Sequence, residues 1–282
     1  MNTQDFSNTQ DFSNKQNSSN SQDASLSNHA EESIHNFDFS LICDYFSSIE
    51  RQGPGNEEAT LRALQLVGPL PQKAKIADLG CGTGTQTLTI AAHTDASIVG
   101  LDLFPQFIDR LNERCKKAGL EHQVTGIVGD MGALPFEEQS LDLIWSEGAI
   151  YNVGFQKGIN LWKSYLKPGG WIAVTDATWL TEERPEEIEQ FWLDAYPEID
   201  TLPHKVKQLE EAGYRHIQTF ILPQACWTDC FYQPQQEAQR VFLQRHPKND
   251  TARMLVENQR HEAELYERYH DFYGYVFYVA SL

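Results

Sequence analysis

The feature that most constrains the fold of this chain is a short apolar segment followed at once by three closely spaced glycines. Residues 76–79 have the composition of a buried parallel strand. Residues 80–84 read Gly-Cys-Gly-Thr-Gly, and residues 85–92 have a helical pattern. Glycines let a ligand approach the backbone closely, and a turn at a helix N-terminus presents free N–H groups. The segment therefore predicts a strand, a ligand-binding turn and a helix.

The spacing of these glycines separates two classes of nucleoside ligand. A dinucleotide-binding turn has the pattern Gly-x-Gly-x-x-Gly. Here the third glycine, Gly84, comes one residue early, and Thr85 stands where the dinucleotide pattern has glycine. Asp78 lies two residues before the first glycine, where its carboxylate would repel a pyrophosphate but suit an ammonium or sulfonium centre. A nicotinamide-dependent oxidoreductase is therefore disfavoured, although it stays an alternative.

Four further segments extend the pattern. Asp102 ends the next apolar segment, and Gly-Asp-Met follows at residues 129–131. An apolar strand at 141–145 and the turn Leu-Lys-Pro-Gly-Gly at 166–170 come after them. Together the segments resemble the class I S-adenosylmethionine-dependent methyltransferases, and most of all the branch that includes the ubiquinone and menaquinone biosynthesis enzymes. The resemblance implies methyl transfer from S-adenosylmethionine to the nitrogen, oxygen or carbon of a small metabolite. A non-catalytic nucleoside-binding protein is the second alternative.

The same resemblance assigns roles at the cofactor site. Asp102 is expected to accept hydrogen bonds from both ribose hydroxyls, Asp130 to bind the adenine amino group, and the backbone near Met131 to contact a ring nitrogen. Arg51 is expected to bind the methionine carboxylate, with a solvent-exposed helix-end arginine as the alternative. The predicted cofactor-binding residues are Arg51, Asp78, Gly80, Cys81, Gly82, Thr83, Gly84, Asp102, Leu103, Asp130, Met131 and Ser146.

Residues that follow the fourth and fifth strands are the candidates for catalysis. A sulfonium is already activated, so methyl transfer needs a positioned nucleophile and, where that nucleophile carries a proton, a base. Glu147 is the first candidate for substrate contact or general base, with compensation of charge at a helix start as its alternative. Tyr151 would orient the substrate or be a core aromatic. Asp176 and Trp179 have similar standing after the fifth strand.

Strand and helix patterns alternate along most of the chain. This alternation predicts an α/β fold with a doubly wound, Rossmann-like, seven-stranded sheet whose last strand is antiparallel, preceded by N-terminal helices. The predicted strands are 76–79, 97–101, 123–128, 141–145, 171–175, 214–222 and 274–280. The predicted helices are 37–47, 57–67, 85–92, 106–118, 158–166, 186–196, 204–212, 235–244 and 251–269.

About fifty residues separate the last two predicted strands, too many for a hairpin. We interpret residues 223–271 as a helical insertion that covers the substrate. Its aromatic side chains either form the core of the insertion or, beside acids, enclose an amine by cation–π contact. These aromatic residues are Trp227, Phe231, Tyr232, Tyr266 and Tyr269.

The composition of the chain predicts its disordered part, its partners and its location. Residues 1–30 are rich in Asn, Gln, Ser and Asp, which predicts a disordered tail before a domain at 31–282. The net charge of −18 disfavours nucleic acid as a partner. Five cysteines without a Cys-x-x-Cys pair favour a reducing, cytoplasmic location, and Cys226 with Cys230 matches structural zinc poorly, so no metal is expected. No apolar segment approaches the roughly 20 residues of a membrane span.

Overall fold

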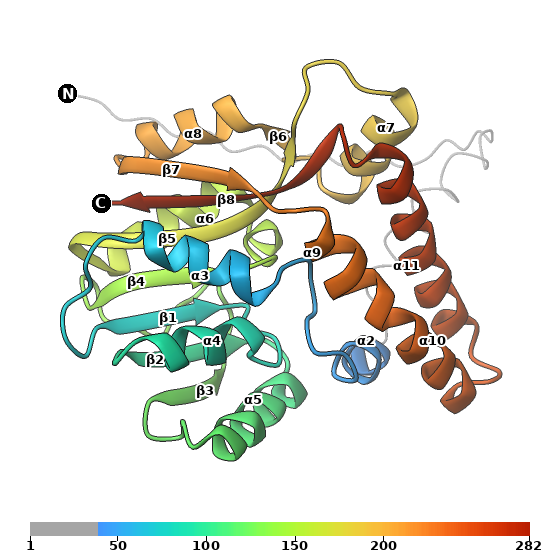
Figure 1. The fold of residues 1–282 in the computed structure, drawn as a ribbon, viewed down its shortest axis with the longest axis horizontal. Helices are drawn as coiled ribbons and strands as arrows, with labels where there is room; N and C mark the ends of the chain where they lie inside the picture. Colours follow the sequence, from blue (N-terminus) through green and yellow to red (C-terminus); the bar gives the residue numbers. More distant parts are fainter. Residues whose placement is uncertain (1–38) are drawn as a thin grey trace, which may run out of the picture. The chain divides into compact units, whose positions relative to one another are not determined.

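The computed structural model describes residues 39–282, so the predicted tail at 1–30 lies outside the described residues. A twisted sheet with the strand order β3-β2-β1-β4-β5-β8-β7 forms the centre of this part of the chain (Figure 1). Its strands are β1 (Lys75–Leu79), β2 (Ser97–Asp102), β3 (Val124–Val128), β4 (Leu141–Ser146), β5 (Leu166–Trp179), β7 (Arg215–Ile221) and β8 (Tyr273–Ser281). A two-residue strand, β6 (Asp200–Thr201), pairs with β5. Because β8 alone runs antiparallel to β5 and to β7, the prediction of a doubly wound sheet with an antiparallel last strand is confirmed.

Alternating strand residues build a separate apolar core on each face of the sheet. In β1, Ile76 belongs to one core, while Ala77 and Leu79 belong to the other. This is the two-residue period of side chains along a strand, with both faces covered as parallel sheets require. The first core also takes residues of α3 (Glu57–Leu66), α4 (Thr85–His93), α5 (Pro105–Ala118) and α7 (Glu186–Ala195). The second takes residues of α6 (Phe155–Trp162) and α8 (Leu202–Glu211).

The strand order reverses between β1 and β4, and this position defines the site. Beyond β1 the chain proceeds to β2 and β3 on one side, whereas β4 and β5 lie on the other. The Ser146 hydroxyl at the end of β4 donates to the Leu79 carbonyl at the end of β1, at 2.8 Å. Ligands of open α/β sheets bind at the carboxyl ends of strands at such a point. The glycine turn after Leu79 therefore begins where a ligand is expected.

Strand β5 is longer than the sequence indicated. A turn was expected at residues 168–170, but β5 runs through it from Leu166 to Trp179. Leu166 pairs with Leu141 and Trp171 with Leu143, so five residues of β5 span two residues of β4. The extra residues form an irregularity in the ladder, and Gly169 there has a φ of 77°, which favours glycine. The turn composition thus marks a bulge within the strand.

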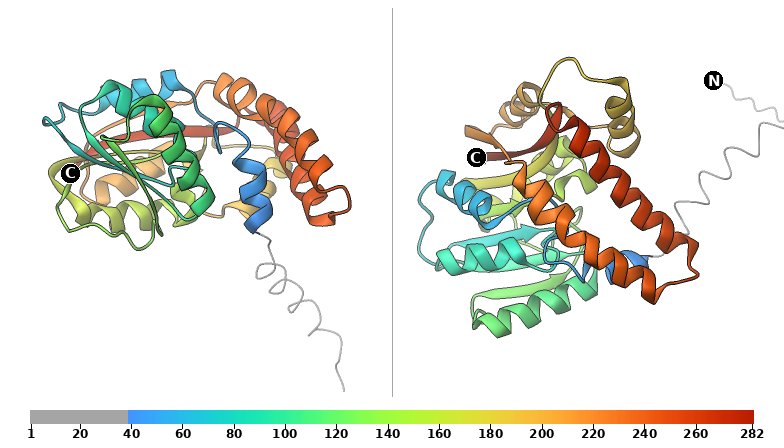
Figure 2. Two further views of the ribbon diagram at one scale, coloured as in Figure 1. Left: turned by 90° about the horizontal axis from the view of Figure 1, so that it is seen from below. Right: turned by 45° about the vertical axis from the view of Figure 1, so that its right-hand side comes forward.

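Helices connect β7 to β8 in place of a hairpin. They are α9 (Ala225–Trp227), a π-helical turn (Thr228–Tyr232) that the sequence did not predict, α10 (Gln233–Arg245) and α11 (Asp250–Tyr269). Figure 2 shows α10 and α11 running antiparallel beside each other. Together with α2 (Phe39–Phe46) they enclose a third core, which includes Leu41, Tyr45, Phe242, Leu255 and Val256. No helix among residues 39–282 is long and apolar enough to cross a membrane.

Two 3-10 turns complete the described elements. One, at Ile150–Asn152, follows β4, and the other, at Lys163–Tyr165, follows α6. The helix predicted at 158–166 is therefore wrong in its bounds: α6 begins three residues earlier, at Phe155, and ends at Trp162. The chain then tightens into the second turn before β5.

A buried ion pair joins β5 to α8. The Lys205 ammonium donates to the Asp176 carboxylate, which also accepts from the Tyr196 hydroxyl at 3.0 Å. Both charged side chains are fully buried, and Asp176 Oδ1 has no hydrogen-bond partner among the described residues. Burial raises the pKa of Asp176, while Lys205 opposes that shift. Removal of either residue would therefore leave the other one buried without its charged partner.

We expect Lys205→Met to destabilise the fold by about 3–5 kcal/mol, because it leaves the Asp176 carboxylate buried without a counter-charge. The free energy of unfolding in urea measures the effect. The double variant Asp176→Asn, Lys205→Met should recover most of the loss. A single variant within about 1 kcal/mol of the wild type would contradict the importance of the pair.

Candidate functional site

The three glycines of the turn are each required by a close neighbour. Gly80, Gly82 and Gly84 all have positive φ, at 69°, 55° and 86°. A Cβ on Gly80 would collide with the side chain of Ala149, and one on Gly84 would collide with Leu111. The turn thus fits tightly between the end of β4 and α5, with its backbone close to neighbouring groups.

Asp102 fixes the turn from the end of β2. Its Oδ2 accepts the Gly82 N–H at 2.9 Å and its Oδ1 accepts the Phe104 N–H at 3.1 Å. The residue is only 8 % exposed, and burial raises the pKa of its carboxyl above the usual range, against these backbone hydrogen bonds. Each oxygen has a second lone pair, so the carboxylate can still accept from hydroxyl groups.

Asp78 is also buried, and its partners come from α4. The Thr87 hydroxyl donates to one oxygen at 2.5 Å and the Gln86 amide to the other at 3.4 Å. Burial is the largest influence on its pKa, which rises to about 7 despite these hydrogen bonds. The charges of Glu147 and Asp102 raise the pKa further. Asp78 therefore lies beneath the glycine turn and links β1 to α4.

Apolar and polar groups flank Asp102 at the adjacent strand ends. Leu103 is 58 % exposed and Val128, at the end of β3, is 53 % exposed. The exposed Asp130 accepts the Gly132 N–H at 2.7 Å, and the Met131 carbonyl accepts the Trp162 indole N–H at 2.9 Å. Exposed apolar side chains beside a carboxylate suit a ligand that has both a flat ring and hydroxyl groups.

The segment between α2 and α3 is hydrogen-bonded to the glycine turn. Gln52 Oε1 accepts the Thr83 N–H at 2.9 Å and would collide with a Cβ on Gly82. The Glu50 carbonyl accepts the hydroxyls of Thr83 and Thr85. Arg114 on α5 donates to the carbonyl and hydroxyl of Thr83, both at 3.1 Å. Thr83 therefore binds this N-terminal segment.

Arg51 and Glu147 form a buried ion pair. The guanidinium donates to Glu147 Oε2 at 3.1 Å, and the side chains are 8 % and 4 % exposed. Glu147 Oε1 accepts from the Thr60 hydroxyl at 2.8 Å and from the Trp145 indole at 3.0 Å. The alternative of a solvent-exposed Arg51 is wrong, because Glu147 and Thr60 bind its guanidinium. Glu147 bonds to these side chains rather than to the N–H groups of a helix start.

Two predicted cofactor residues have side chains directed into the protein. The Cys81 thiol is buried beside Gly100 and contacts the Gly82 carbonyl at 3.6 Å. The Ser146 hydroxyl is fully buried and bonded to Leu79. Backbone atoms remain the parts of these residues that face the turn.

Tyr151 lies beyond the end of β4 on the side of the helical segment 223–271. It is 44 % exposed and packs edge-on against Tyr196, with ring centroids 6.0 Å apart. Desolvation nevertheless raises the pKa of its hydroxyl. The alternative of a core aromatic is wrong for Tyr151. It is right for Trp179, which is buried and stacked by the Arg184 guanidinium at 4.3 Å.

Most aromatic residues of the segment 223–271 pack on one another. Trp227 stacks on Tyr266 with centroids 4.5 Å apart, and both belong to the first core. Phe231 is buried as well, and Tyr269 donates to Glu187. Tyr232 is half-buried and packs on Phe231, Trp227 and Tyr266, and its hydroxyl donates to Glu262 at 3.0 Å.

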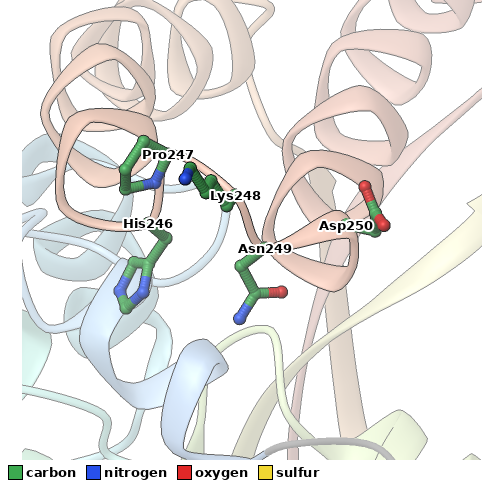
Figure 3. A pocket seen from close by; sticks show the side chains of 5 residues that line it. All are labelled: His246, Pro247, Lys248, Asn249 and Asp250. Atoms are coloured by element: carbon green, nitrogen blue, oxygen red, sulfur yellow. The ribbon is translucent and has the colours of Figure 1, made fainter.

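A separate hollow lies at the turn between α10 and α11 (Figure 3). It is lined by His246, Pro247, Lys248, Asn249 and Asp250. Asn249 caps α11 and His246 bonds to Asp44, so these side chains serve the turn itself. Within residues 39–282 no group of three or more His, Cys, Asp or Glu residues is arranged to hold a metal ion.

Comparison with known proteins relates part of this chain to a known family. Residues 76–170 match the family model described as a methyltransferase domain. The class I S-adenosylmethionine-dependent methyltransferase prediction is confirmed at this level, whereas the ubiquinone and menaquinone branch is not distinguished from others.

Relatives of the methyltransferase domain act on different small molecules. The 27-O-demethylrifamycin SV methyltransferase of Amycolatopsis mediterranei (strain S699) is 30 % identical over 124 residues, which are 43 % of this chain and 46 % of that protein. The dimethylglycine N-methyltransferase of Parasynechococcus marenigrum (strain WH8102) is 32 % identical over 114 residues, 40 % of this chain and 41 % of that protein. The chain thus spans less than half the length of these two relatives.

Similarity in fold covers more of this chain than similarity in sequence does. A methyltransferase from Geobacter sulfurreducens, solved with S-adenosyl-L-homocysteine, superimposes with a TM-score of 0.74 at 20 % identity. The match covers 86 % of this chain and 97 % of that one.

Several residues around the glycine turn were not predicted from the sequence. Gln52, Thr60, Gln86, Thr87 and Arg114 supply side-chain hydrogen bonds to the turn or to the acids near it. Gln52 directly follows Arg51, which was predicted to bind the cofactor, and this position was the available signal. The others lie on helices, where polar residues usually face solvent.

We expect Asp78→Asn to stabilise the protein progressively more as the pH rises. A native pKa of about 7 against an ordinary value of 3.8 means that the native state binds the proton more tightly. Its contribution to stability is present below about pH 4 and is lost as the pH rises through about 7. The gain from Asp78→Asn should reach on the order of 2–4 kcal/mol at pH 8.

Urea unfolding at pH 4, 6 and 8 measures that gain. Asp109→Asn, which removes one exposed charge, is the control for the general effect of net charge. A difference between the two variants that does not change with pH would show that folding leaves the pKa of Asp78 unshifted.

Proposed function

We propose that this protein transfers a methyl group from S-adenosylmethionine to a small molecule. One observation carries the proposal: a three-glycine turn at the reversal of strand order, held by a carboxylate from the end of β2. The similarity of residues 76–170 to the methyltransferase domain supports the same activity.

The residues present fit S-adenosylmethionine. The Asp102 carboxylate keeps lone pairs for the ribose hydroxyls, and the exposed Leu103 and Val128 offer apolar surface to adenine. Asp130 is exposed beside them and suits the adenine amino group. Gly80 and Gly82 keep side chains off the turn, so that the nucleoside can lie close to the backbone.

The bound cofactor supplies an electrophilic methyl group on a positively charged sulfur. The chain then has to bind, orient and desolvate the acceptor beside it. We assign acceptor contact to Tyr151, which is exposed in the 3-10 turn that follows β4. We assign Glu147 a positioning role, because its carboxylate binds Arg51, Thr60 and Trp145 and so fixes the N-terminal segment at the end of β4.

Two finer assignments are part of the proposal. The motifs in residues 76–176 resemble those of the ubiquinone and menaquinone branch, which leaves the acceptor open because acceptor contacts lie outside these motifs. The five cysteines are all free, and four of them are buried, which supports a reducing compartment such as the cytoplasm.

Calorimetry and a turnover assay test the function. We expect S-adenosylmethionine and S-adenosylhomocysteine to bind, NAD and NADP not to bind, and S-adenosylhomocysteine to form with fractionated cell metabolites. Binding of NAD(P) alone would favour the oxidoreductase. Binding of S-adenosylmethionine without turnover on any fraction would favour the non-catalytic nucleoside binder.

We expect Asp102→Ala to weaken S-adenosylmethionine binding by more than about 1.5 kcal/mol, because charge-assisted hydrogen bonds to hydroxyls are lost and the Gly82 N–H loses its acceptor. Calorimetric affinity is the measurement, and Asp95→Ala, in the exposed turn before β2, is the control. Unchanged affinity would mean that the ribose binds elsewhere.

A further inference from the structure

Glu262 on α11 is a carboxylate without a counter-charge. It accepts a hydrogen bond from the Tyr232 hydroxyl, and among the described ion pairs of residues 39–282 none includes it. Arg260, two residues earlier on the helix, donates its Nε–H to Gln239 instead. Desolvation raises the pKa of Glu262, although part of the side chain is exposed. The carboxylate is therefore partly withdrawn from water, while the exposed part of the side chain can still be reached by a ligand.

Tyr232 contacts this carboxylate, and tyrosines from other segments lie within range of its charge. Burial is the largest cause that raises the pKa of Tyr151 after β4, Tyr232 in the π-helical turn, and Tyr273 and Tyr275 on β8, and the charge of Glu262 raises these pKa values further. Trp227 joins two of these rings, with centroids 4.8 Å from Tyr275 and 6.1 Å from Tyr232. The Trp227 indole N–H is buried without a hydrogen-bond partner among the described residues.

This cluster of Glu262, Tyr151, Tyr232, Tyr275 and Trp227 reaches the methyl-transfer site through β4. The Tyr275 ring lies 3.4 Å from the position that a Cβ on Gly148 would take. Gly148 follows β4 by two residues, and β4 is the strand beside β1 and its glycine turn. The cluster therefore adjoins the edge of the sheet at which the proposed cofactor binds.

We propose that the methyl acceptor is a cationic amine held between Glu262 and the rings of Tyr151, Tyr232 and Tyr275. The inference rests on the proposed function and names its substrate class. Tyrosine and tryptophan faces attract a cation within about 6 Å, and a carboxylate without a counter-charge gains most from a positive ligand. An anionic acceptor would be repelled by Glu262, and a neutral acceptor would leave its charge unpaired. The net charge of −18 also attracts cations to the protein.

An ammonium has no lone pair, so the acceptor first gives one proton to the Glu262 carboxylate, which becomes a carboxylic acid. The nitrogen lone pair then forms the new N–C bond while the S–C bond breaks, and the sulfur keeps that bonding pair. Positive charge passes from sulfur to nitrogen. A tertiary amine ends as a quaternary ammonium, and other amines end as protonated products.

Choline is the probe for the site, because its quaternary nitrogen cannot be methylated and binding is measured without turnover. Its uncharged carbon analogue, dimethylbutanol, has nearly the same shape. We expect calorimetry in saturating S-adenosylhomocysteine, and without it, to show choline binding at least about tenfold more tightly than dimethylbutanol.

Variants assign the effect to the cluster. Glu262→Gln should weaken choline binding by about tenfold, or about 1.4 kcal/mol, and Tyr151→Leu should weaken it with Glu262 left in place. Glu264→Gln, exposed on the same helix, is the matched control and should bind choline as the wild type does. Thermal unfolding of each variant establishes that it is folded.

Equal binding of choline and dimethylbutanol, or wild-type choline affinity in both Glu262→Gln and Tyr151→Leu, would overturn the inference. Calorimetry of S-adenosylhomocysteine on the same samples tests the proposed function separately. A protein that binds S-adenosylhomocysteine without preferring cations remains a methyltransferase with a different acceptor class. A protein that binds choline at the cluster but no S-adenosyl compound would refute the proposed function and leave a cation-binding site without a role in methyl transfer.

Discussion

The carboxylate of Asp102 is the interaction on which the site depends. It accepts two backbone N–H groups, one from the glycine turn and one from the residue that begins the approach to α5. Because the Gly82 N–H lies twenty residues before Asp102 in the sequence, this one side chain fixes the turn relative to the end of β2. The same carboxylate is buried and retains lone pairs, so it can hold the turn and bind hydroxyls together.

Two further acids lie near this turn, and each has its own set of partners. Asp78 lies beneath it, bonded to Thr87 and Gln86, and Glu147 lies beyond it, paired with Arg51. Each of these acids is satisfied within the protein, which explains how several carboxylates can lie near one strand edge without mutual repulsion dominating. Glu262 accepts a hydrogen bond from Tyr232 but, unlike Glu147, has no counter-charge among the described ion pairs, and this difference is the basis for assigning it to the acceptor.

The sequence predicted the fold class because its signals are local. An apolar strand, a glycine turn and a helix follow one another within twenty residues at 75–93, and the alternation continues to β5. The predicted bounds of the elements were wrong where the local composition is compatible with two different structures. Pro168 with two glycines suggests a turn, but pairing with β4 turned it into a bulge within β5. The π-helical turn at Thr228–Tyr232 has no local signature of this kind.

Sequence by itself determined the strand-turn-helix unit and the acids at the strand ends, and it predicted the methyltransferase class, because each depends on neighbours in the chain. Only the tertiary structure decided the partners of those side chains. Arg51 meets Glu147 across 96 positions of sequence, and Gln52 meets Thr83 across 31. Likewise, Glu262 accepts a hydrogen bond from Tyr232 across 30 positions. Such contacts depend on how the sheet and helices pack, which no local pattern of residues encodes.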